Sequence, residues 1–311
     1  MSAKRAVVAG LLFVLIGTMS VTAQVAQIYA ACEGKSTLSQ YDYVTGVETT
    51  LYNTTGHPDD LVLNSLGQLI YSVPTQGTVN LFDPTTGINT VLATNIGGAR
   101  DLIITPDGNN LMIAKNASPA SIYEYNFSSG TTTIFFPKTK GITSMNGLSF
   151  DVYGNFYAVA NRTEILQLNP QTAAIVNTLV LETGKAGGAD GLTYDSYTNS
   201  LWTTHDSNTL GDGLVQIPVQ ASGFVSTSPG FSFYPINNMG GLDGIKSDGS
   251  GNLYIGAIWT APVYNIPTNT LLYNPVVKGA DGVALVPDTY GAQRSNKTTV
   301  PQSARDAAQN P

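Results

Sequence analysis

The chain has 311 residues, with 14 Lys and Arg against 21 Asp and Glu, so its net charge at pH 7 is −7. Proteins that bind nucleic acid need clustered basic side chains, and this balance argues against a nucleic-acid partner, whereas it is compatible with a bound cation. Only 11% of the residues are charged. A closed all-β fold of this length is commonly a single domain.

The N-terminal 23 residues have the features of a secretory signal. Lys4 and Arg5 precede an apolar run over residues 6–16, and small residues stand at Val21 and Ala23, where a signal peptidase cleaves. The apolar run is short for a membrane span. We therefore predict a signal peptide over residues 1–23, an extracellular or periplasmic protein, and no membrane span after cleavage. An uncleaved anchor is the alternative.

The stretch over residues 240–270 defines a repeat unit. It opens with Leu242-Asp243-Gly244 and continues as an alternating strand to a turn at residues 248–252. A second strand over residues 253–257 and a third over residues 262–266 follow. Short β-rich runs separated by Gly, Asn, Asp and Pro are typical of hairpins, and no helical period is present.

Weaker copies of the opening motif recur every 38 to 53 residues. They are Pro58-Asp59-Asp60, Ala99-Arg100-Asp101, Met145-Asn146-Gly147, Ala189-Asp190-Gly191 and Ala280-Asp281-Gly282. A period of about 40 to 50 residues with four short strands is typical of a propeller blade. We therefore predict an all-β, six-bladed β-propeller over residues 24–287.

The two ends of the predicted propeller complement each other. Residues 27–32, 37–43 and 47–52 match the second, third and fourth strands of a blade, and the missing innermost strand is found at residues 279–287. The last blade is thus predicted to combine one C-terminal strand with three N-terminal strands, which closes the ring. Residues 288–311 are polar and aperiodic, and we predict a disordered tail there.

The residue before each repeated glycine is predicted to point at the mouth of the central channel. These residues are Asp59, Arg100, Asn146, Asp190, Asp243 and Asp281. Neighbouring carboxylates raise one another's pKa, so such a ring must hold protons, a cation or both. The chain has only two His and one Cys. Carboxylate and amide oxygens therefore favour Ca²⁺ or Mg²⁺ over zinc.

Two phrases, Asn146-Gly147-Leu148 and Asp190-Gly191-Leu192-Thr193-Tyr194-Asp195, together with the Gly-Asn-Leu-Tyr at residues 251–254, resemble the senescence marker protein-30/gluconolactonase group of six-bladed propellers. The resemblance implies a divalent cation held by Asn146, Asp190 and Asp281, which polarises a lactone or ester carbonyl. Ca²⁺ is favoured over Mg²⁺, and no organic cofactor is expected. Two departures stand out. The family's acid is normally Glu where this chain has Asp281, and Arg100 replaces a neutral residue.

This hypothesis assigns roles to the remaining ring residues. Asp190 or Asp243 would accept the proton of an attacking water and so be catalytic. Arg100 could hold an anionic group of the substrate. Asp59 and the nearby His57 would complete the substrate-binding set, with His57 also a candidate general base.

The competing hypothesis is a non-enzymatic binding or scaffold propeller. In it, Arg100 is itself the cation and forms a structural ion-pair network with the ring acids. Long connections predicted over residues 204–214 and 218–238 would offer a contact surface. Either way, we expect a small molecule or a glycan at the channel mouth.

Five Asn-x-Ser/Thr sequences occur, at Asn53, Asn116, Asn126, Asn161 and Asn296. Their predicted positions in loops, edges and tail are compatible with a secreted glycoprotein.

Overall fold

The computed structural model describes residues 27–43, 45–139, 141–181, 188–207, 211–225, 230–236, 241–273 and 279–286. The predicted signal peptide over residues 1–23, the predicted tail over residues 288–311 and Asn296 lie outside the described residues. Within them, no helix has the length and apolar character needed to cross a membrane.

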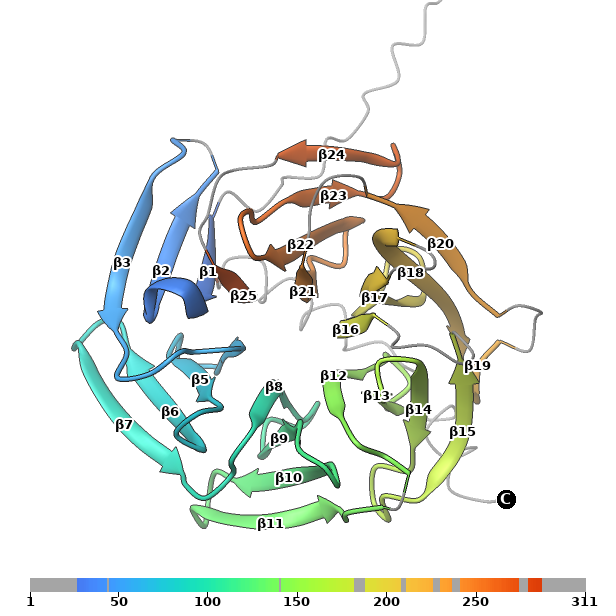
Figure 1. Cartoon of the computed structure of the whole chain (residues 1–311), viewed down its shortest axis with the longest axis horizontal. Helices are drawn as coiled ribbons and strands as arrows, with labels where there is room; N and C mark the ends of the chain where they lie inside the picture. The colour runs from blue at the N-terminus through green and yellow to red at the C-terminus, as the bar shows by residue number, and fades with distance from the viewer. Residues whose placement is uncertain are drawn as a thin grey trace, which may run out of the picture.

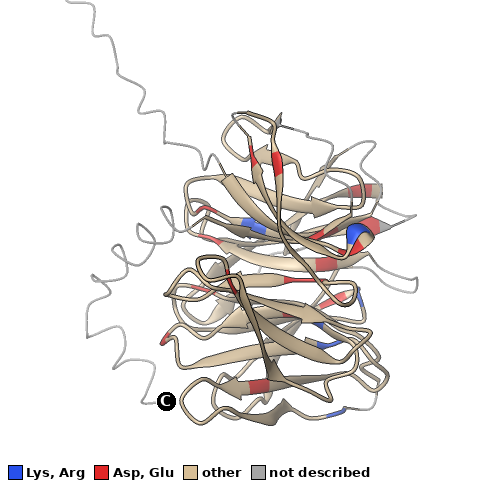
Figure 2. Cartoon of the chain, turned by 90° about the vertical axis from the view of Figure 1, so that its left-hand side faces the viewer, with Lys and Arg blue, Asp and Glu red and all other residues tan. Residues whose placement is uncertain are grey.

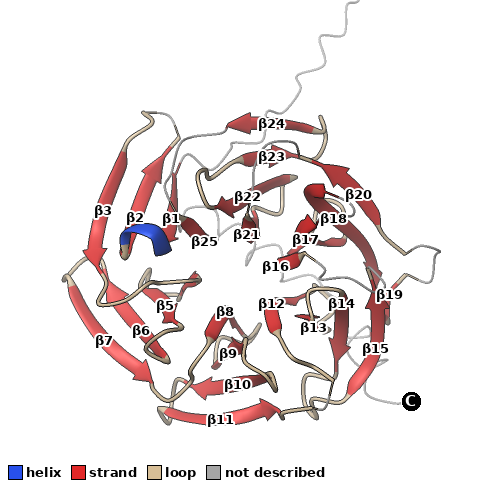
Figure 3. Cartoon of the chain, viewed as in Figure 1, coloured by secondary structure: helices blue, strands red, loops and turns tan. Residues whose placement is uncertain are grey.

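Six antiparallel sheets stand around a central axis and form a six-bladed β-propeller, as predicted (Figure 1). Nearly all of the described chain is strand, turn or loop, apart from the single 3₁₀ turn η1 (Glu33–Lys35) (Figure 3). Positions of charged residues are sparse along the blades, as the low charge fraction requires (Figure 2).

Each blade places its strands in order from the axis to the rim. The first blade consists of β4 (Leu61–Leu63), β5 (Leu69–Val73), β6 (Thr78–Asp83) and β7 (Ile88–Ala93). The second consists of β8 (Ala99–Ile104), β9 (Asn110–Lys115), β10 (Ser121–Asn126) and β11 (Thr131–Phe136). The third consists of β12 (Met145–Phe150), β13 (Phe156–Ala160), β14 (Glu164–Leu168) and β15 (Ile175–Val180). The fourth is β16 (Ala189–Asp195), β17 (Ser200–Ser207) and β18 (Gly211–Gln220), with β19 (Gly223–Phe224) and β20 (Ser232–Pro235) paired to β18. The fifth is β21 (Leu242–Ser247), β22 (Asn252–Ala257), β23 (Val263–Asn265) and β24 (Thr270–Tyr273).

The sixth blade is assembled from both ends of the chain, and the predicted closure is confirmed. Its strands are β25 (Ala280–Leu285), β1 (Gln27–Cys32), β2 (Thr37–Asp42) and β3 (Glu48–Asn53). The innermost strand β25 pairs with β1 from Ile28 opposite Leu285 to Cys32 opposite Ala280. Because this pairing joins the first and last described strands, the sheet edge that either would expose is covered.

The prediction of a long connection over residues 204–214 was wrong. Instead β17 and β18 form an extended hairpin that pairs from Ser200 opposite Pro218 to Ser207 opposite Gly211. Thr203, Thr204 and His205 are fully buried in it. Much of the residue 218–238 segment also pairs, since β19 and β20 both lie against β18.

The apolar core lies between neighbouring blades. One cluster, for example, joins Tyr157 and Ile165 of the third blade to Leu192 and Val215 of the fourth. The hydrophobic effect therefore stabilises blade against blade around the whole ring.

Close packing at the axis explains the repeated glycine. A Cβ built on Gly244 would lie 2.5 Å from the backbone oxygen of Asp281 in the next blade, and one on Gly191 would lie 2.6 Å from that of Asp243. Neither approach is tolerable for a methyl group. The inner strands can approach this closely only because glycine stands at these positions.

A Gly244→Ala substitution tests this packing. We expect it to lower the free energy of unfolding by about 1–3 kcal/mol because the added methyl group forces neighbouring backbones apart. The matched control is Gly97→Ala, since a Cβ at Gly97 meets no atom within 4 Å. Thermal unfolding followed by circular dichroism measures both variants, and equal stability of the two would contradict the packing argument.

Candidate functional site

All six predicted ring residues line one pocket at the axis: Asp59, Arg100, Asn146, Asp190, Asp243 and Asp281. Five of them stand at the beginnings of five different inner strands, and Asp59 lies just before the sixth, β4. Sequence periodicity therefore placed the members of this ring correctly. Their chemical roles stay predictions.

Four of these side chains stand at β-bulges. The strand register shifts between Ala99 and Leu102, between Met145 and Leu148, between Ala189 and Leu192, and between Leu242 and Ile245. Each shift leaves the ring residue and its follower outside the regular ladder. A bulge bends the strand locally and reorients a side chain, which is why such bulges recur beside functional sites.

Two arginines pair with ring acids. The Arg100 guanidinium forms an ion pair with Asp59, whose side chain is almost fully buried. Arg162, in the turn between β13 and β14, places its Nη1 atom 3.5 Å from Asp190 Oδ2. Arg162 was not among the predicted ring residues, because nothing in the repeat pattern indicates that a side chain from that turn reaches the next blade.

Burial raises the pKa of every ring carboxyl group. Desolvation is the main cause, and it raises the pKa of Asp59 to about 7 although Arg100 opposes it. For Asp281 desolvation is assisted by a hydrogen bond with Glu33 and by the charge of Asp59, and its pKa rises to about 9. The pKa of Asp243 rises well above its usual range because of burial and the nearby Asp190 and Asp59.

The pKa of Asp190 is also raised by burial, but more neighbouring groups oppose the increase. Burial raises its pKa, while Arg162, Arg100 and a hydrogen bond from Asn146 lower it. The ring thus holds more carboxyl groups than its arginines neutralise, and the balance must come from protons or from a cation.

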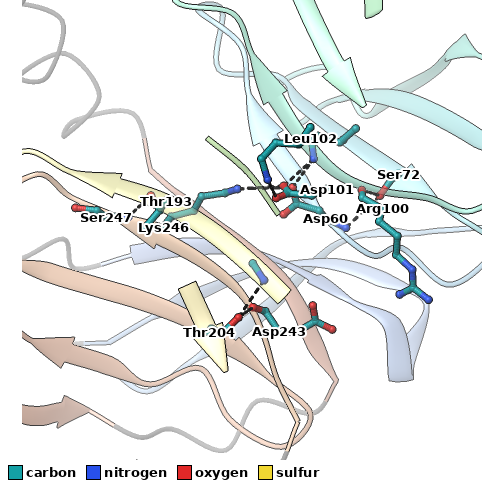
Figure 4. A network of polar contacts seen from close by, with 12 residues as sticks. Asp60, Ser72, Arg100, Asp101, Leu102, Thr193, Thr204, Asp243, Lys246 and Ser247 are labelled. Atoms are coloured by element: carbon teal, nitrogen blue, oxygen red, sulfur yellow. Dashed lines mark hydrogen bonds and ion pairs between the residues drawn. The ribbon is translucent and has the colours of Figure 1, made fainter. Parts of the chain in front are cut away.

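A second set of charges forms the floor of the pocket (Figure 4). Lys246 of β21 reaches across the channel, and its Nζ atom lies 3.6 Å from Asp60 Oδ2 and 3.7 Å from Asp101 Oδ1. Asp101 also accepts a hydrogen bond of 2.6 Å from the Leu148 backbone N–H, and Asp60 accepts one of 2.9 Å from Leu102. These contacts tie four blades together at the axis.

A sequence signal for this floor existed. Asp60 and Asp101 occupy the motif position that is glycine in the other four blades. A side chain at that position must point along the channel, since there is no room sideways. Burial is the main cause that raises the pKa of Asp101 well above its usual range, and Lys246 opposes it.

His57 is not brought to the pocket. It is exposed, and its Nδ1 atom lies 2.8 Å from the Glu33 carbonyl oxygen and 3.3 Å from Ser36 Oγ. It therefore lies at the junction of the first and last blades. Its roles in substrate binding and as a general base stay predictions.

The pocket offers oxygen atoms, which are the type of ligand that a hard cation binds. Asn146 Oδ1 and Asp281 Oδ2 are buried and have no hydrogen-bond partner within the described part of the chain. The cavity between the ring side chains has a volume of about 20 Å³, which accommodates a water molecule or an ion but no organic molecule. Among the described residues, no three His, Cys, Asp or Glu side chains are grouped so that they could hold a metal ion. A cation site would therefore need the Asn146 amide oxygen as a ligand.

Comparison with known proteins identifies the fold alone. No model of a protein family matches the sequence, and no curated protein matches it. A hydrazine synthase structure from Kuenenia stuttgartiensis is similar with a TM-score of 0.60 and 14% identity, over 88% of this chain and 94% of that one. A streptogramin B lyase structure is similar with a TM-score of 0.55 and 17% identity, over 72% of this chain and 70% of that one. Membership of the senescence marker protein-30/gluconolactonase group stays a prediction.

The raised pKa values predict an unusual pH dependence of stability. A carboxyl group whose pKa is raised by folding stabilises the fold fully below its unfolded pKa of about 4, and this stabilisation is lost as the pH rises through the folded value. With folded pKa values of about 7 for Asp59 and about 9 for Asp281, we expect the melting temperature of cation-free protein to fall between pH 5 and pH 9.

Differential scanning calorimetry across that pH range measures the effect. Asp281→Asn should flatten part of the slope, whereas Asp107→Asn should leave it unchanged, because hydrogen bonds lower the pKa of Asp107 in an exposed turn. A melting temperature that is constant or rises from pH 5 to pH 9 would show that the ring acids are not held in their neutral form.

Proposed function

We propose that the channel mouth binds a divalent cation, with Ca²⁺ favoured over Mg²⁺, and hydrolyses a lactone or ester. The proposal rests mainly on one observation: Asn146 Oδ1 and Asp281 Oδ2 are buried acceptors with no hydrogen-bond partner among the described residues, and both residues line a cavity of ionic size. Unsatisfied buried oxygens are costly, and a cation removes that cost. Asn146, Asp190 and Asp281 would hold it, and it would polarise the substrate carbonyl and acidify a bound water.

Two ring acids are suited to proton transfer. The Asp243 side chain has no hydrogen bond or ion pair within the described chain, although its backbone oxygen accepts one from Thr204. Its raised pKa makes it a stronger base than an ordinary carboxylate once ionised. Asp190, which Arg162 and Asn146 orient, is the second candidate base.

Arg100 is suited to substrate binding. Its side chain is 39% exposed although it is paired with Asp59, so donor groups remain open to the mouth. A guanidinium orients an oxygen-bearing group of the substrate through directed hydrogen bonds. In this assignment Asp59 positions Arg100 and need not contact the substrate itself.

A second candidate function, binding without catalysis, has its own support. Arg100 and Asp59, Arg162 and Asp190, and Lys246 with Asp60 and Asp101 already form ion pairs. Such a network can serve as a rigid axis for a propeller that binds ligands at its rim. Two similarly folded proteins, a lyase and a synthase, are enzymes, but similarity at this level of identity concerns the fold and not the function.

Secretion and glycosylation also belong to the proposal. They are supported by the N-terminal sequence and by the exposure of Asn53, one of the predicted glycan acceptors. Mass spectrometry of protein recovered from the medium of a eukaryotic host would test both.

Metal stripping and reloading tests the hydrolase. We expect chelated protein to take up one equivalent of Ca²⁺ and to gain lactone- or ester-opening activity with it. Asp190→Asn and Asp281→Asn should lose Ca²⁺ uptake. Asp243→Asn should keep Ca²⁺ but lose activity by about 10²-fold or more, because it removes only a general base.

The matched control is Asp107→Asn, an acid-to-amide change in an exposed turn, which should behave as the wild type. Isothermal titration calorimetry and a pH-stat assay provide the readouts. Absence of Ca²⁺ and Mg²⁺ uptake, with no rate difference between stripped and reloaded protein, would eliminate the hydrolase and leave the binding propeller.

A further inference from the structure

The turn over residues 258–260, between β22 and β23, borders the channel mouth. The Ile258 backbone N–H donates to Gly241 over 3.2 Å, and the Ile258 carbonyl accepts from the Gly279 N–H over 2.7 Å. Gly241 and Gly279 each stand two residues before a ring acid, Asp243 and Asp281. The turn is therefore held between the beginnings of two inner strands, beside the pocket those acids line.

This turn is apolar where its equivalents are polar. Trp259 is 63% exposed and Ile258 is 44% exposed. The corresponding turns of the other blades carry small, polar or charged residues wherever the structure describes them. They are residues 33–36, 74–77, 116–119 and 161–163. Adjacent exposed Ile and Trp side chains beside a pocket are suited to contact with a ligand, because an aromatic ring offers a large rigid surface at low entropic cost.

The pocket itself limits what this ligand can be. A cavity of about 20 Å³ takes an ion or water, so the body of any organic ligand must lie over the mouth against the rim. Arg100 and Arg162 at the mouth already pair with Asp59 and Asp190, and Lys246 pairs with acids on the floor. The positive charges are therefore already balanced by acids, which disfavours an anionic ligand.

The hydrogen-bonding groups favour a ligand with hydroxyl groups. The Asp243 carboxyl group has no hydrogen bond in the described chain, and Arg100 is partly exposed, so the mouth offers both acceptors and donors. A ring compound with hydroxyls along its edge and C–H groups on its face can use these groups and an indole together. An organic cation could use the indole and the acids, but would leave the Arg100 donors unused.

We propose that the residue 258–260 turn is a ligand-binding ledge on which a neutral saccharide ring stacks against Trp259 while its hydroxyl groups reach Asp243 and Arg100. This inference rests on the proposed site at the channel mouth and deepens it by assigning the ligand class and a specificity residue.

Tryptophan fluorescence provides a selective test, because the chain has two Trp residues and Trp202 is fully buried. Acrylamide quenching of the full-length protein should come almost entirely from Trp259. We expect cellobiose, maltose or chitobiose to protect Trp259 from quenching. The Trp202→Phe variant should show the same protection, and Trp259→Ala should weaken sugar binding by about tenfold or more in calorimetry.

Ca²⁺ uptake separates this inference from the proposed function. Trp259→Ala should match the wild type in Ca²⁺ uptake and in thermal unfolding, and the unfolding curve shows that it is folded. Protection by a sugar without Ca²⁺ uptake would support the ledge and refute the hydrolase. No protection by any of the three sugars, or protection by tetramethylammonium alone, would overturn the saccharide assignment whatever the outcome for Ca²⁺.

Discussion

The close approach of six inner strands at the axis is the constraint on which the rest of the structure depends. Backbones of adjacent blades approach so closely that a single Cβ at Gly191 or Gly244 would collide with the next strand. The bulges that accompany these glycines turn the preceding side chains into one small space. Because four of those side chains are carboxyl groups, the geometry that closes the propeller also concentrates acid in a poorly solvated channel mouth.

That concentration determines what the mouth can do. Arg100 and Arg162 form ion pairs with two of the four carboxyl groups, and Lys246 forms ion pairs with the acids of the floor below them. The remaining negative charge of the ring must be neutralised by protons or by a bound cation, and the two cases correspond to different functions. Protons alone would leave a neutral, polar channel mouth that can bind a ligand, whereas a cation would add the ability to activate a carbonyl group. Both possibilities use the same residues, so the protonation state of the ring is the decisive quantity.

The repeat spacing was sufficient to predict the fold and to predict which residues form the ring. The spacing of motifs such as Asn146-Gly147 and Asp190-Gly191 determined which residue of each blade faces the axis, and strand pairing at the two chain ends confirmed the closure. Periodicity could not indicate how far long side chains reach. Arg162 and Lys246 contact other blades from positions that no repeat distinguishes. The β17–β18 hairpin was missed because its Gly and Asp residues resemble a loop.

The protonation state of the ring can be measured directly by infrared difference spectroscopy of the metal-free protein. At neutral pH we expect a carbonyl stretch from protonated carboxylic acids, since burial raises the pKa of Asp281 to about 9 and that of Asp243 well above its usual range. The band should weaken in Asp281→Asn and Asp243→Asn, and Ca²⁺ should weaken it in the wild type. A metal-free spectrum at pH 7 without any protonated-carboxyl band would contradict the account.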